Sequence, residues 1–568
     1  MTFTTGNNSI DALARASWND APGSGAALTF SFLETLPADA TRKDAFGFMP
    51  MTEVQRSAAR EALSVWSTVA NVSFTEVAND GNVQLGSNDQ SAVNSNAYAY
   101  YPKANGTAQL FLSTAVAANT SFAIGSKGWE TMLHEIGHNL GLKHPGDYDS
   151  SGFNKVGPWL PEKTDNNDYS VMSYNNGFSY KQTKLHSATP MVYDIQALQY
   201  LYGANTSYRT GDDVYHIQAS DAPFCIWDAG GSDTLDFSAC SQASSISLRA
   251  GGFSASASGV TNVSIAYGVT IESVIAGSGD AKIYANDAGN SITGGTGDDV
   301  IYVGAGNDRI DGGAGADTVM FKGNFADYAI SAADGKLFID GEGHDILSAV
   351  ETIKFHDLSF KSGTLERLLE GSTGDDRLAG HNDRVIGGRA GVDTVVYEGA
   401  LANFALADSG ASWTVTLNAN QNSWDRLFDV ERLQFSDAAV ALDTDGHAGQ
   451  AYRLYQATFD RAPDLPGLGF WINHMDHGMT IEEMAGHFMN SDEFGRSYGK
   501  LSNEAFITQL YRNALHREPE AAGLAFHLNN LEHGMSRAIE LVGFSESDEN
   551  QAQVIGQIAH GITYLPFA

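Results

Sequence analysis

Cysteine, basic side chains and long apolar runs are all scarce in this 568-residue sequence. Lysine and arginine together number 33, against 68 aspartates and glutamates, which gives a net charge of −35. This acidic excess argues against nucleic acid or an anionic membrane as a partner, and it fits a chain that collects divalent cations. No stretch of about 18 apolar residues occurs, so we expect no transmembrane segment.

Two further absences concern export and oxidation. Residues 1–8 lack a basic segment followed by an apolar run, so we expect no cleavable Sec signal. Only two cysteines occur, Cys225 and Cys240. They either bridge across a hairpin built from residues 226–237 or stay free, because spacing alone does not establish the Cα geometry that a disulfide needs.

One motif carries more chemical information than the rest of the chain: the eleven residues from His134 to His144 read HExxHxxGxxH. On a helix, His134 and His138 lie on one face, where neutral imidazoles suit a zinc ion that keeps one position open for water. Glu135 stands where it can take a proton from that water. Gly141 lets the chain leave the helix in a left-handed conformation, which returns His144 as third ligand. Five specified residues at fixed spacing make chance histidines on an amphipathic helix a poor explanation.

A second motif, Ser170-Val-Met172-Ser-Tyr174, follows about thirty residues later. With it the chain resembles the metzincin metalloproteases, whose long zinc motif is followed by a Met-turn. Within that group, the sequence most resembles the serralysin family, through the His-Pro-Gly-Asp that begins at His144 and the Leu-Tyr-Gly-Ala that begins at Leu201.

The resemblance implies roles for two residues of this turn. Met172 would form the hydrophobic floor under the zinc, and Tyr174 would swing between the metal and the substrate oxyanion. Independently of the family, a tyrosine is a suitable donor to a developing oxyanion.

The first 205 residues show the element order that the metzincin arrangement implies. Apolar periodicity predicts helices over 52–70, 129–140 and 191–202, and alternation predicts strands over 72–77, 98–101 and 110–112. By resemblance, a strand around 97–101 lies at the edge of the sheet above the zinc cleft and pairs with an extended peptide substrate. Backbone pairing of that kind gives affinity with weak sequence preference.

Residues 276–320 fall into five nonapeptides that match the GGxGxDxUx repeat of a calcium-binding parallel β-roll. The apolar eighth place recurs at Ile283, Ile292, Ile301, Ile310 and Val319. Glycines allow tight turns whose carbonyls face inward, and the sixth-place aspartate adds a carboxylate for Ca²⁺. The candidate calcium residues are Asp299, Asp308, Asp317, Gly294, Gly297, Gly304, Gly306, Gly313 and Gly315. Two upstream copies carry Ala281 and Asn290 in the sixth place, so those turns are structural only or use Asp280 instead.

A shorter array over 371–396 contains two more copies, with Asp376 and Asp393 in the sixth place. The eight residues between the copies break the nonapeptide register by one, so we expect fewer ions there. Residues 317–331 also resemble 393–407, so turns that lead into a small β unit occur twice. This duplication lies outside the usual serralysin pattern, and the resemblance to that family covers about residues 9–323.

The last segment, 446–568, has fewer glycines and helical periodicity, and it too is duplicated: 455–479 aligns with 511–535. Each copy predicts a helix, a proline-containing turn and a second helix that ends at His-Gly-Met. The segment resembles a helical repeat domain of undefined activity from secreted and surface-layer-associated bacterial proteins. Its histidines, His477 and His533 among them, invite a metal interpretation, but favourable placement at helix C-termini explains them more simply.

These observations predict a multidomain protein: an α+β metzincin catalytic domain, a parallel β-roll with additional β units, and an all-α C-terminal domain. The expected boundaries are 1–205 for the zinc domain, 206–323 for the calcium-binding roll, 324–370 for a small β unit, 371–445 for the second short repeat block with its β unit, and 446–568 for the helical repeats.

The function these features favour is that of a secreted, calcium-dependent zinc endopeptidase, with one catalytic Zn²⁺ and several structural Ca²⁺. Its expected partners are protein substrates, an ABC-type exporter, and a cell-surface or S-layer partner bound through 446–568. The alternative is a non-catalytic calcium-binding surface protein with a vestigial protease domain, and the intact Glu135 and Tyr174 argue against it. The sequence identifies no natural substrate.

Overall fold

The computed structural model describes residues 4–103, 106–148, 157–365, 367–380, 383–410, 412–420 and 423–567. The chain divides into two compact units. The first comprises residues 1–322 and 333–355, and the second comprises 323–332 and 356–568. None of the helices within the described ranges combines the length and the apolar character that a bilayer crossing requires.

The first unit begins with a five-stranded sheet of order β2-β1-β3-β5-β4. The parallel strands β3 and β5 are buried along their whole length, which explains why their sequences do not alternate cleanly. The strands are β1 (Ala26–Phe32), β2 (Val72–Glu76), β3 (Val83–Asn88), β4 (Ala97–Ala99) and β5 (Ala108–Ser113). Strand β4 is antiparallel to β5 and lies at the sheet edge, as predicted.

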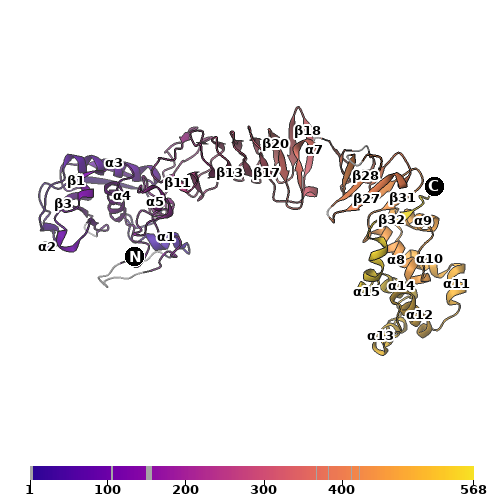
Figure 1. Cartoon of the computed structure of the whole chain (residues 1–568). Helices are drawn as coiled ribbons and strands as arrows, with labels where there is room; N and C mark the ends of the chain where they lie inside the picture. Colours follow the sequence, from indigo (N-terminus) through magenta and orange to yellow (C-terminus); the bar gives the residue numbers. More distant parts are fainter. Residues whose placement is uncertain are drawn as a thin grey trace. The chain divides into compact units, whose positions relative to one another are not determined.

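Helices α3 (Glu53–Val69) and α4 (Lys127–Asn139) lie side by side against this sheet (Figure 1). Thr52 begins α3 through a capping box with Gln55. The predicted zinc helix begins two residues earlier than expected, because the Ser126 side chain accepts a hydrogen bond from the Trp129 N–H. The other helices here are α1 (Asn8–Leu13), α2 (Arg42–Ala45), α5 (Phe178–Thr183) and α6 (Val192–Tyr202).

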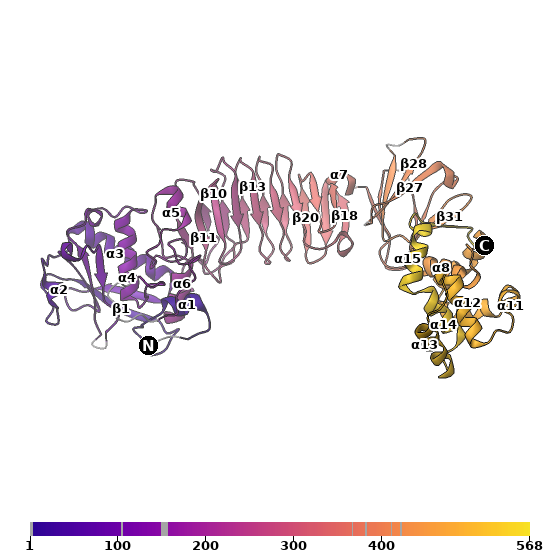
Figure 2. The same cartoon turned by 60° about the horizontal axis from the view of Figure 1, so that its bottom comes forward.

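The rest of the first unit, which we call the repeat region, consists of short strands in two sheets with mainly parallel pairing. One runs β21-β17-β15-β13-β9-β10-β11-β7 and the other β19-β20-β16-β14-β12-β8-β6. Figure 2 shows these strands stacked like rungs. Their bounds are β6 (Val214–His216), β7 (Phe224–Ile226), β8 (Thr234–Asp236), β9 (Ser244–Ser247), β10 (Phe253–Ala257), β11 (Val260–Ile265), β12 (Ser273–Ile275), β13 (Ala281–Tyr284), β14 (Ser291–Thr293), β15 (Val300–Tyr302), β16 (Arg309–Asp311), β17 (Thr318–Met320), β19 (Lys336–Asp340), β20 (His344–Ser348) and β21 (Thr352–Lys354).

Successive nonapeptides of the repeat region enter alternate sheets, so partners in a sheet are 18 residues apart. Ile283 pairs with Ile301 in one sheet, and Ile292 pairs with Ile310 in the other. The five eighth-place side chains predicted to stack are each at most 1% exposed: Ile283, Ile292, Ile301, Ile310 and Val319. They form the thin apolar core between the two sheets.

The cysteine hairpin considered from the sequence does not form. Cys225 lies in β7, which pairs with β11, whereas the strand that follows it, β8, belongs to the other sheet. Both Cys225 and Cys240 are free and buried. The hairpin was wrong because neighbouring segments here alternate between two sheets instead of pairing with each other.

The second unit contains two five-stranded sheets, of order β23-β25-β29-β28-β27 and β24-β26-β30-β31-β32. The predicted register break is present, since Arg377 pairs with Thr394, 17 residues away and not 18. The strands are β23 (Leu368–Glu370), β24 (Arg377–Ala379), β25 (Val385–Gly387), β26 (Thr394–Val396), β27 (Phe404–Asp408), β28 (Trp413–Leu417), β29 (Trp424–Phe428), β30 (Arg432–Gln434), β31 (Ala439–Ala441) and β32 (Ile562–Tyr564). Strands β18 (Ala329–Ala333) and β22 (Ser359–Lys361), with the short helix α7 (Ser362–Leu365), complete the elements before the helical domain.

The C-terminal duplication has the predicted helix, turn and helix in each copy, and two further helices follow each copy. The first copy has α8 (His447–Phe459) and α9 (Leu465–Asp476), followed by α10 (Ile481–Met489) and α11 (Asp492–Tyr498); the second has α12 (Asn503–Leu515) and α13 (Ala521–Glu532), followed by α14 (Arg537–Ser545) and α15 (Asp548–Ile558). Gly478 and Gly534 follow α9 and α13 with φ of +98° and +96°, which is the expected helix stop. The apolar tail pairs as β32 with β31, and the Leu565 N–H donates to the Leu465 carbonyl at the start of α9.

A buried arginine joins the helical domain to its sheet. The Arg432 side chain, in β30, is 4% exposed and forms ion pairs with Asp443 and with Asp476 of α9. We expect Arg432→Leu to destabilise this junction by about 3–5 kcal/mol, because it removes the buried guanidinium that two carboxylates share. Hydrogen exchange in α8 and α9 measures the effect.

The exposed pair Arg512–Glu518 provides the control. Its side chains are 52% and 66% exposed, so Arg512→Leu should change local stability by no more than about 1 kcal/mol. Equal exchange rates in the two variants would contradict the proposed role of Arg432.

Candidate active site and repeat-turn carboxylates

Three imidazoles converge at the C-terminal part of α4. The Nε2 atom of His144 lies 3.1 Å from Nε2 of His134 and 3.0 Å from Nε2 of His138. His134 and His138 are held by the helix, one turn apart, and His144 is held by the loop that follows Gly141. The predicted three-ligand cluster is therefore assembled around one point.

Hydrogen bonds of the Nδ1 atoms fix the orientation and the tautomer of the His134 and His138 imidazoles. Nδ1 of His134 lies 2.8 Å from the Val171 carbonyl oxygen, and Nδ1 of His138 lies 2.7 Å from that of Leu142. A carbonyl accepts, so each Nδ1 carries the proton and each Nε2 presents a lone pair. Burial lowers the pKa of His138 to about 4 and holds the pKa of His134 well below its usual value. Neutral, oriented imidazoles are the donor set that zinc requires, so these residues fit that ion.

Glu135 lies beside the cluster and is 6% exposed. Its Oε2 atom is buried and has no hydrogen-bond partner in the described structure. Burial raises the pKa of this carboxyl to about 8. A buried carboxylate with a free oxygen next to three imidazoles is suited to accept and return a proton.

The Met-turn lies directly under α4. Met172 is fully buried, and a Cβ added to Gly137 would lie 2.6 Å from its Sδ atom, so the helix needs glycine there to sit this close. Asp194 of α6 holds the turn: it accepts hydrogen bonds from the Ser170 hydroxyl at 2.6 Å and from the Val171 N–H at 2.7 Å. Neither Gly137 nor Asp194 is predictable from its own neighbourhood, because their partners are remote in sequence.

Gly141 adopts φ +97°, the left-handed conformation that the motif predicted. The N-terminal segment clamps the loop that begins there, since the N–H groups of Arg15 and Ala16 donate to the Gly141 carbonyl. A Cβ at Gly141 would lie 2.0 Å from the Ala16 carbonyl oxygen. The third imidazole thus depends on a position that tolerates only glycine.

We expect Gly141→Ala to weaken zinc binding by about 10- to 100-fold, the usual cost of disturbing the groups that orient metal ligands. The measurement is zinc competition against a chelator of known affinity. Gly106→Ala is the matched control, because Gly106 also has a positive φ, +80°, but a Cβ there meets nothing within 4 Å. Equal zinc affinity in the two variants would rule out the role assigned to Gly141.

Tyr174 stands at the mouth of the site with 60% of its surface exposed. Its ring stacks against His134, with centroids 5.6 Å apart, and against Tyr148 at 5.0 Å. The position is open enough for the side chain to swing, and close enough to the imidazoles for its hydroxyl to reach a group bound there.

A hollow of about 550 Å³ opens beside Glu135 and His134. Asn96 and Ala97, from the start of edge strand β4, form one wall, and Tyr174 lies at another. Among the strands of the described residues, β4 has no neighbour on its outer side, and such a free edge can pair with the backbone of an extended peptide.

The sixth-place carboxylates of the repeat turns form a ladder. Oδ1 of Asp299 accepts the N–H of Ala281, Oδ1 of Asp308 accepts that of Asn290, and Oδ1 of Asp317 accepts that of Asp299, at 2.7, 2.7 and 2.8 Å. Each donor precedes its acceptor by 18 residues. In the second array Asp393 accepts the N–H of Asp376 in the same way, 17 residues back.

The other oxygens of several of these carboxylates are buried without a partner: Oδ2 of Asp299, Asp317 and Asp393. Burial raises the pKa of Asp299 to about 7 and raises that of Asp308, Asp317 and Asp393. A Cβ at Gly294 would lie 2.5 Å from Oδ2 of Asp299 and 2.2 Å from the Gly312 carbonyl. Free carboxylate oxygens beside inward carbonyls fit a calcium ion.

The predicted turn glycines lie in these same turns. Gly313 and Gly315 have φ of +93° and +145°. The others pack tightly on neighbouring rungs, where an added Cβ would lie 1.9–2.6 Å from a backbone or carboxylate atom: Gly294, Gly297, Gly304 and Gly306. The Asp280 carboxylate accepts the N–H of Asp298, a donor later in the chain, so Asp280 does not take the place in the ladder that a sixth-place acid occupies.

Further carboxylates of this kind were missed. Asp345 accepts the N–H of Asp308 at 2.8 Å, and burial raises its pKa to about 7. Asp213, Asp228 and Asp233 have carboxylate oxygens within 4.8 Å of one another, and Oδ2 of Asp233 is buried without a partner. The sequence does contain a signal for two of these residues, because Asp233 and Asp345 each precede a buried leucine by two residues. The sixth-place aspartate of the repeat precedes its apolar residue by the same interval. The signal was overlooked because these copies stand apart from the regular array.

His477 and His533 of the helical domain form hydrogen bonds with their own helices. Nδ1 of His477 lies 2.7 Å from the Asn473 carbonyl oxygen, and Nδ1 of His533 lies 2.8 Å from that of Asn529. Among the described residues, neither belongs to a group arranged to hold a metal ion.

Three family models match the chain. The model described as "Matrixin" matches residues 44–156, and "Peptidase M10 serralysin C terminal" matches 192–461. The model "Domain of unknown function (DUF4214)" matches 447–494 and 485–554, one copy for each half of the duplication.

Curated relatives match a little under half of this chain. "Serralysin" from Proteus mirabilis is 40% identical over 42% of this chain and 55% of its own length. "Metalloprotease AprA" from Pseudomonas entomophila is 35% identical over 48% of this chain and 62% of its own. "Serralysin G" from Dickeya chrysanthemi is 40% identical over 48% and 61%. The chain therefore spans between half and two thirds of these relatives.

Proposed function

We propose that this chain, a serralysin-like member of the metzincin metalloproteases, is a secreted zinc endopeptidase that cleaves extracellular or cell-surface proteins. The observation that carries the proposal is the set of three imidazoles in which Nε2 of His144 lies 3.1 and 3.0 Å from those of His134 and His138, beside the unpartnered oxygen of Glu135. This arrangement suits hydrolysis of an acyl bond by an activated water.

In the proposed mechanism, His134, His138 and His144 hold one zinc ion, which supplies Lewis-acid chemistry when bound. Glu135 takes the proton of the attacking water and returns it to the leaving amine. Tyr174 donates its hydroxyl proton in a hydrogen bond to the oxyanion. Met172, held by the turn that Asp194 fixes, supports the imidazoles from below.

The proposal includes dependence on calcium. The turn residues predicted as ligands, including Asp299, Asp317 and Asp393, present buried oxygens that lack a partner. Several Ca²⁺ ions would neutralise them, and we propose that the repeat region completes its folding only with the ions bound, so that binding free energy becomes folding free energy. The cluster of Asp213, Asp228 and Asp233 is a further candidate for one ion.

We also propose that the chain leaves the cell through an ABC-type exporter, as chains with such repeats typically do, and folds where calcium is abundant. Residues 446–568 are then the part available for binding a surface partner. Deleting this segment should reduce retention on cells while peptide hydrolysis persists; unchanged retention would remove the anchoring proposal alone.

The test of the central proposal is zinc content measured together with casein hydrolysis. We expect one zinc per chain and hydrolysis that 1,10-phenanthroline abolishes and added zinc restores. His138→Phe, which removes a ligand, should bind no zinc and cleave nothing. A zinc-loaded, calcium-loaded chain that cleaves neither casein nor a mixed peptide library would instead fit a non-catalytic calcium-binding surface protein.

A further inference from the structure

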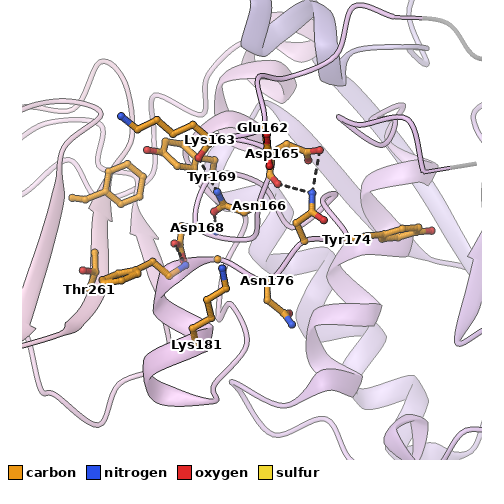
Figure 3. A pocket seen from close by; sticks show the side chains of 14 residues that line it. Glu162, Lys163, Asp165, Asn166, Asp168, Tyr169, Tyr174, Asn176, Lys181 and Thr261 are labelled. Atoms are coloured by element: carbon orange, nitrogen blue, oxygen red, sulfur yellow. Dashed lines mark hydrogen bonds between the residues drawn. The ribbon is translucent and has the colours of Figure 1, made fainter.

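A second and larger hollow, of about 950 Å³, adjoins the zinc cleft. Tyr174 lines both hollows, so it forms the ridge between them. Figure 3 shows Tyr174 at one end of the second hollow and Thr261 of strand β11 at the other. The catalytic domain and the repeat region therefore build this hollow together.

Aromatic side chains dominate the apolar part of its lining. Phe178, at the start of α5, is 59% exposed although it stands beside a hollow, and Tyr174 is 60% exposed. On the far side the rings of Tyr169 and Phe253 pack with centroids 5.0 Å apart, and Phe253 belongs to strand β10. Exposed rings gathered around one concavity are typical of a binding surface.

The charges around the hollow do not favour a charged ligand. Three carboxylates and two ammonium groups line it, and two of the carboxylates already accept hydrogen bonds inside the protein. Asp165 accepts the Ser173 hydroxyl, and Asp168 accepts the N–H groups of Phe178 and Ser179. Glu162, Lys163 and Lys181 stand exposed at the rim with opposite signs. The amides of Asn166, Asn175 and Asn176 also line the hollow, so the exposed rings offer apolar contact beside neutral polar groups.

The wall from the repeat region is fixed to the catalytic domain by direct bonds. The Ser179 hydroxyl of α5 donates to the Thr261 carbonyl, and the Thr261 N–H donates to the Gln182 side chain at 3.2 Å. Phe178 and Phe253 are therefore held in a defined relation across the hollow, which gives a preformed site.

We infer that this hollow is a second substrate subsite, which takes an aromatic or large aliphatic side chain of the same polypeptide whose scissile bond lies at the zinc cleft. The occupant follows from continuity: a polypeptide that leaves the cleft past Tyr174 enters this hollow next. The inference rests on the proposed function, and it gives the repeat region a direct part in choosing substrates.

The test uses the full-length protein, loaded with zinc and calcium, and two matched peptide sets. Long peptides extend well beyond the scissile bond on both sides and carry phenylalanine or alanine at each distal position in turn. Short peptides contain only the residues next to the scissile bond. We expect one distal position, on one side only, where phenylalanine raises kcat/KM about tenfold through a lower KM.

Phe253→Ala should abolish that advantage and leave the short peptides unchanged. Phe178→Ala, at an exposed position that folding does not need, should do the same from the other wall. Phe338→Ala is the control, because this partly exposed phenylalanine of β19 does not line the hollow. No distal preference in the native protein, or equal slowing of short and long peptides by both variants, would overturn the inference. Failure to cleave any peptide would instead count against the proposed function.

Discussion

Replacing Glu135 with glutamine should lower the hydrolysis rate of a peptide substrate by about 10³- to 10⁴-fold while one zinc remains bound. The amide keeps the shape of the side chain but cannot take a proton, and a positioned general base contributes about 10²–10⁴-fold to a rate. Oε2 of Glu135 has no partner within the described structure, so the substitution breaks no bond of the fold. The measurement is kcat/KM on a fluorogenic peptide, together with zinc content.

Glu61→Gln is the control for this comparison, because Glu61 is an exposed glutamate of α3, outside both hollows. It should match the native rate. Equal activity in the Glu135→Gln variant would show that another group accepts the proton, whereas loss of zinc along with activity would assign Glu135 a role in building the site.

Chelation of calcium should unfold the repeat region and, with it, abolish peptide hydrolysis. At a calcium concentration a hundredfold above the dissociation constant, each site contributes about 3 kcal/mol to stability. Without the ions, buried oxygens such as Oδ2 of Asp299 and of Asp317 have no partner. We expect the strand signal in circular dichroism to fall with chelator and to return with calcium.

Single substitutions test whether the carboxylates of the turns are responsible for this dependence on calcium. Asp317→Asn should raise the calcium concentration needed for folding, because it removes a carboxylate from a turn. Asp311→Asn, at an exposed place in β16, should not. A circular dichroism spectrum and melting temperature that are the same in chelator and in calcium would contradict the whole proposal of calcium-dependent folding.

The parts of the molecule that follow from sequence are those whose chemistry is local. The spacing of His134, His138 and Gly141 specifies a helix face and a left-handed exit, and both are present. The nine-residue period likewise places Ile283 and Ile301 in the core. In these cases a single element, or a repeat of one, contains all the information.

What could not be predicted depends on segments that meet only in the fold. Asp194 supports the Met-turn from a helix more than twenty residues away, and nothing in its own neighbourhood marks it. Cys225 and Cys240 suggested a hairpin because local pairing is the simplest reading of two strands, whereas here each strand pairs across an intervening rung. The hollow beside Tyr174 needs Phe253, whose proximity no spacing rule encodes.

The carboxylate ladder makes the repeat array directional. Every N–H in it is received by a carboxylate later in the chain, and at the end of the series Asp308 and Asp317 donate to Asp345 and Glu351. A truncation from the front would remove ladder donors and the acceptors of exposed N–H groups only, such as Asp280 for the Asp298 N–H, but one from the back would leave a buried donor with no acceptor. The later residues act as an end cap, as terminal repeats do in other stacked architectures. Rungs are thus expected to assemble from this cap backward, toward the catalytic domain, so that the protease is completed last.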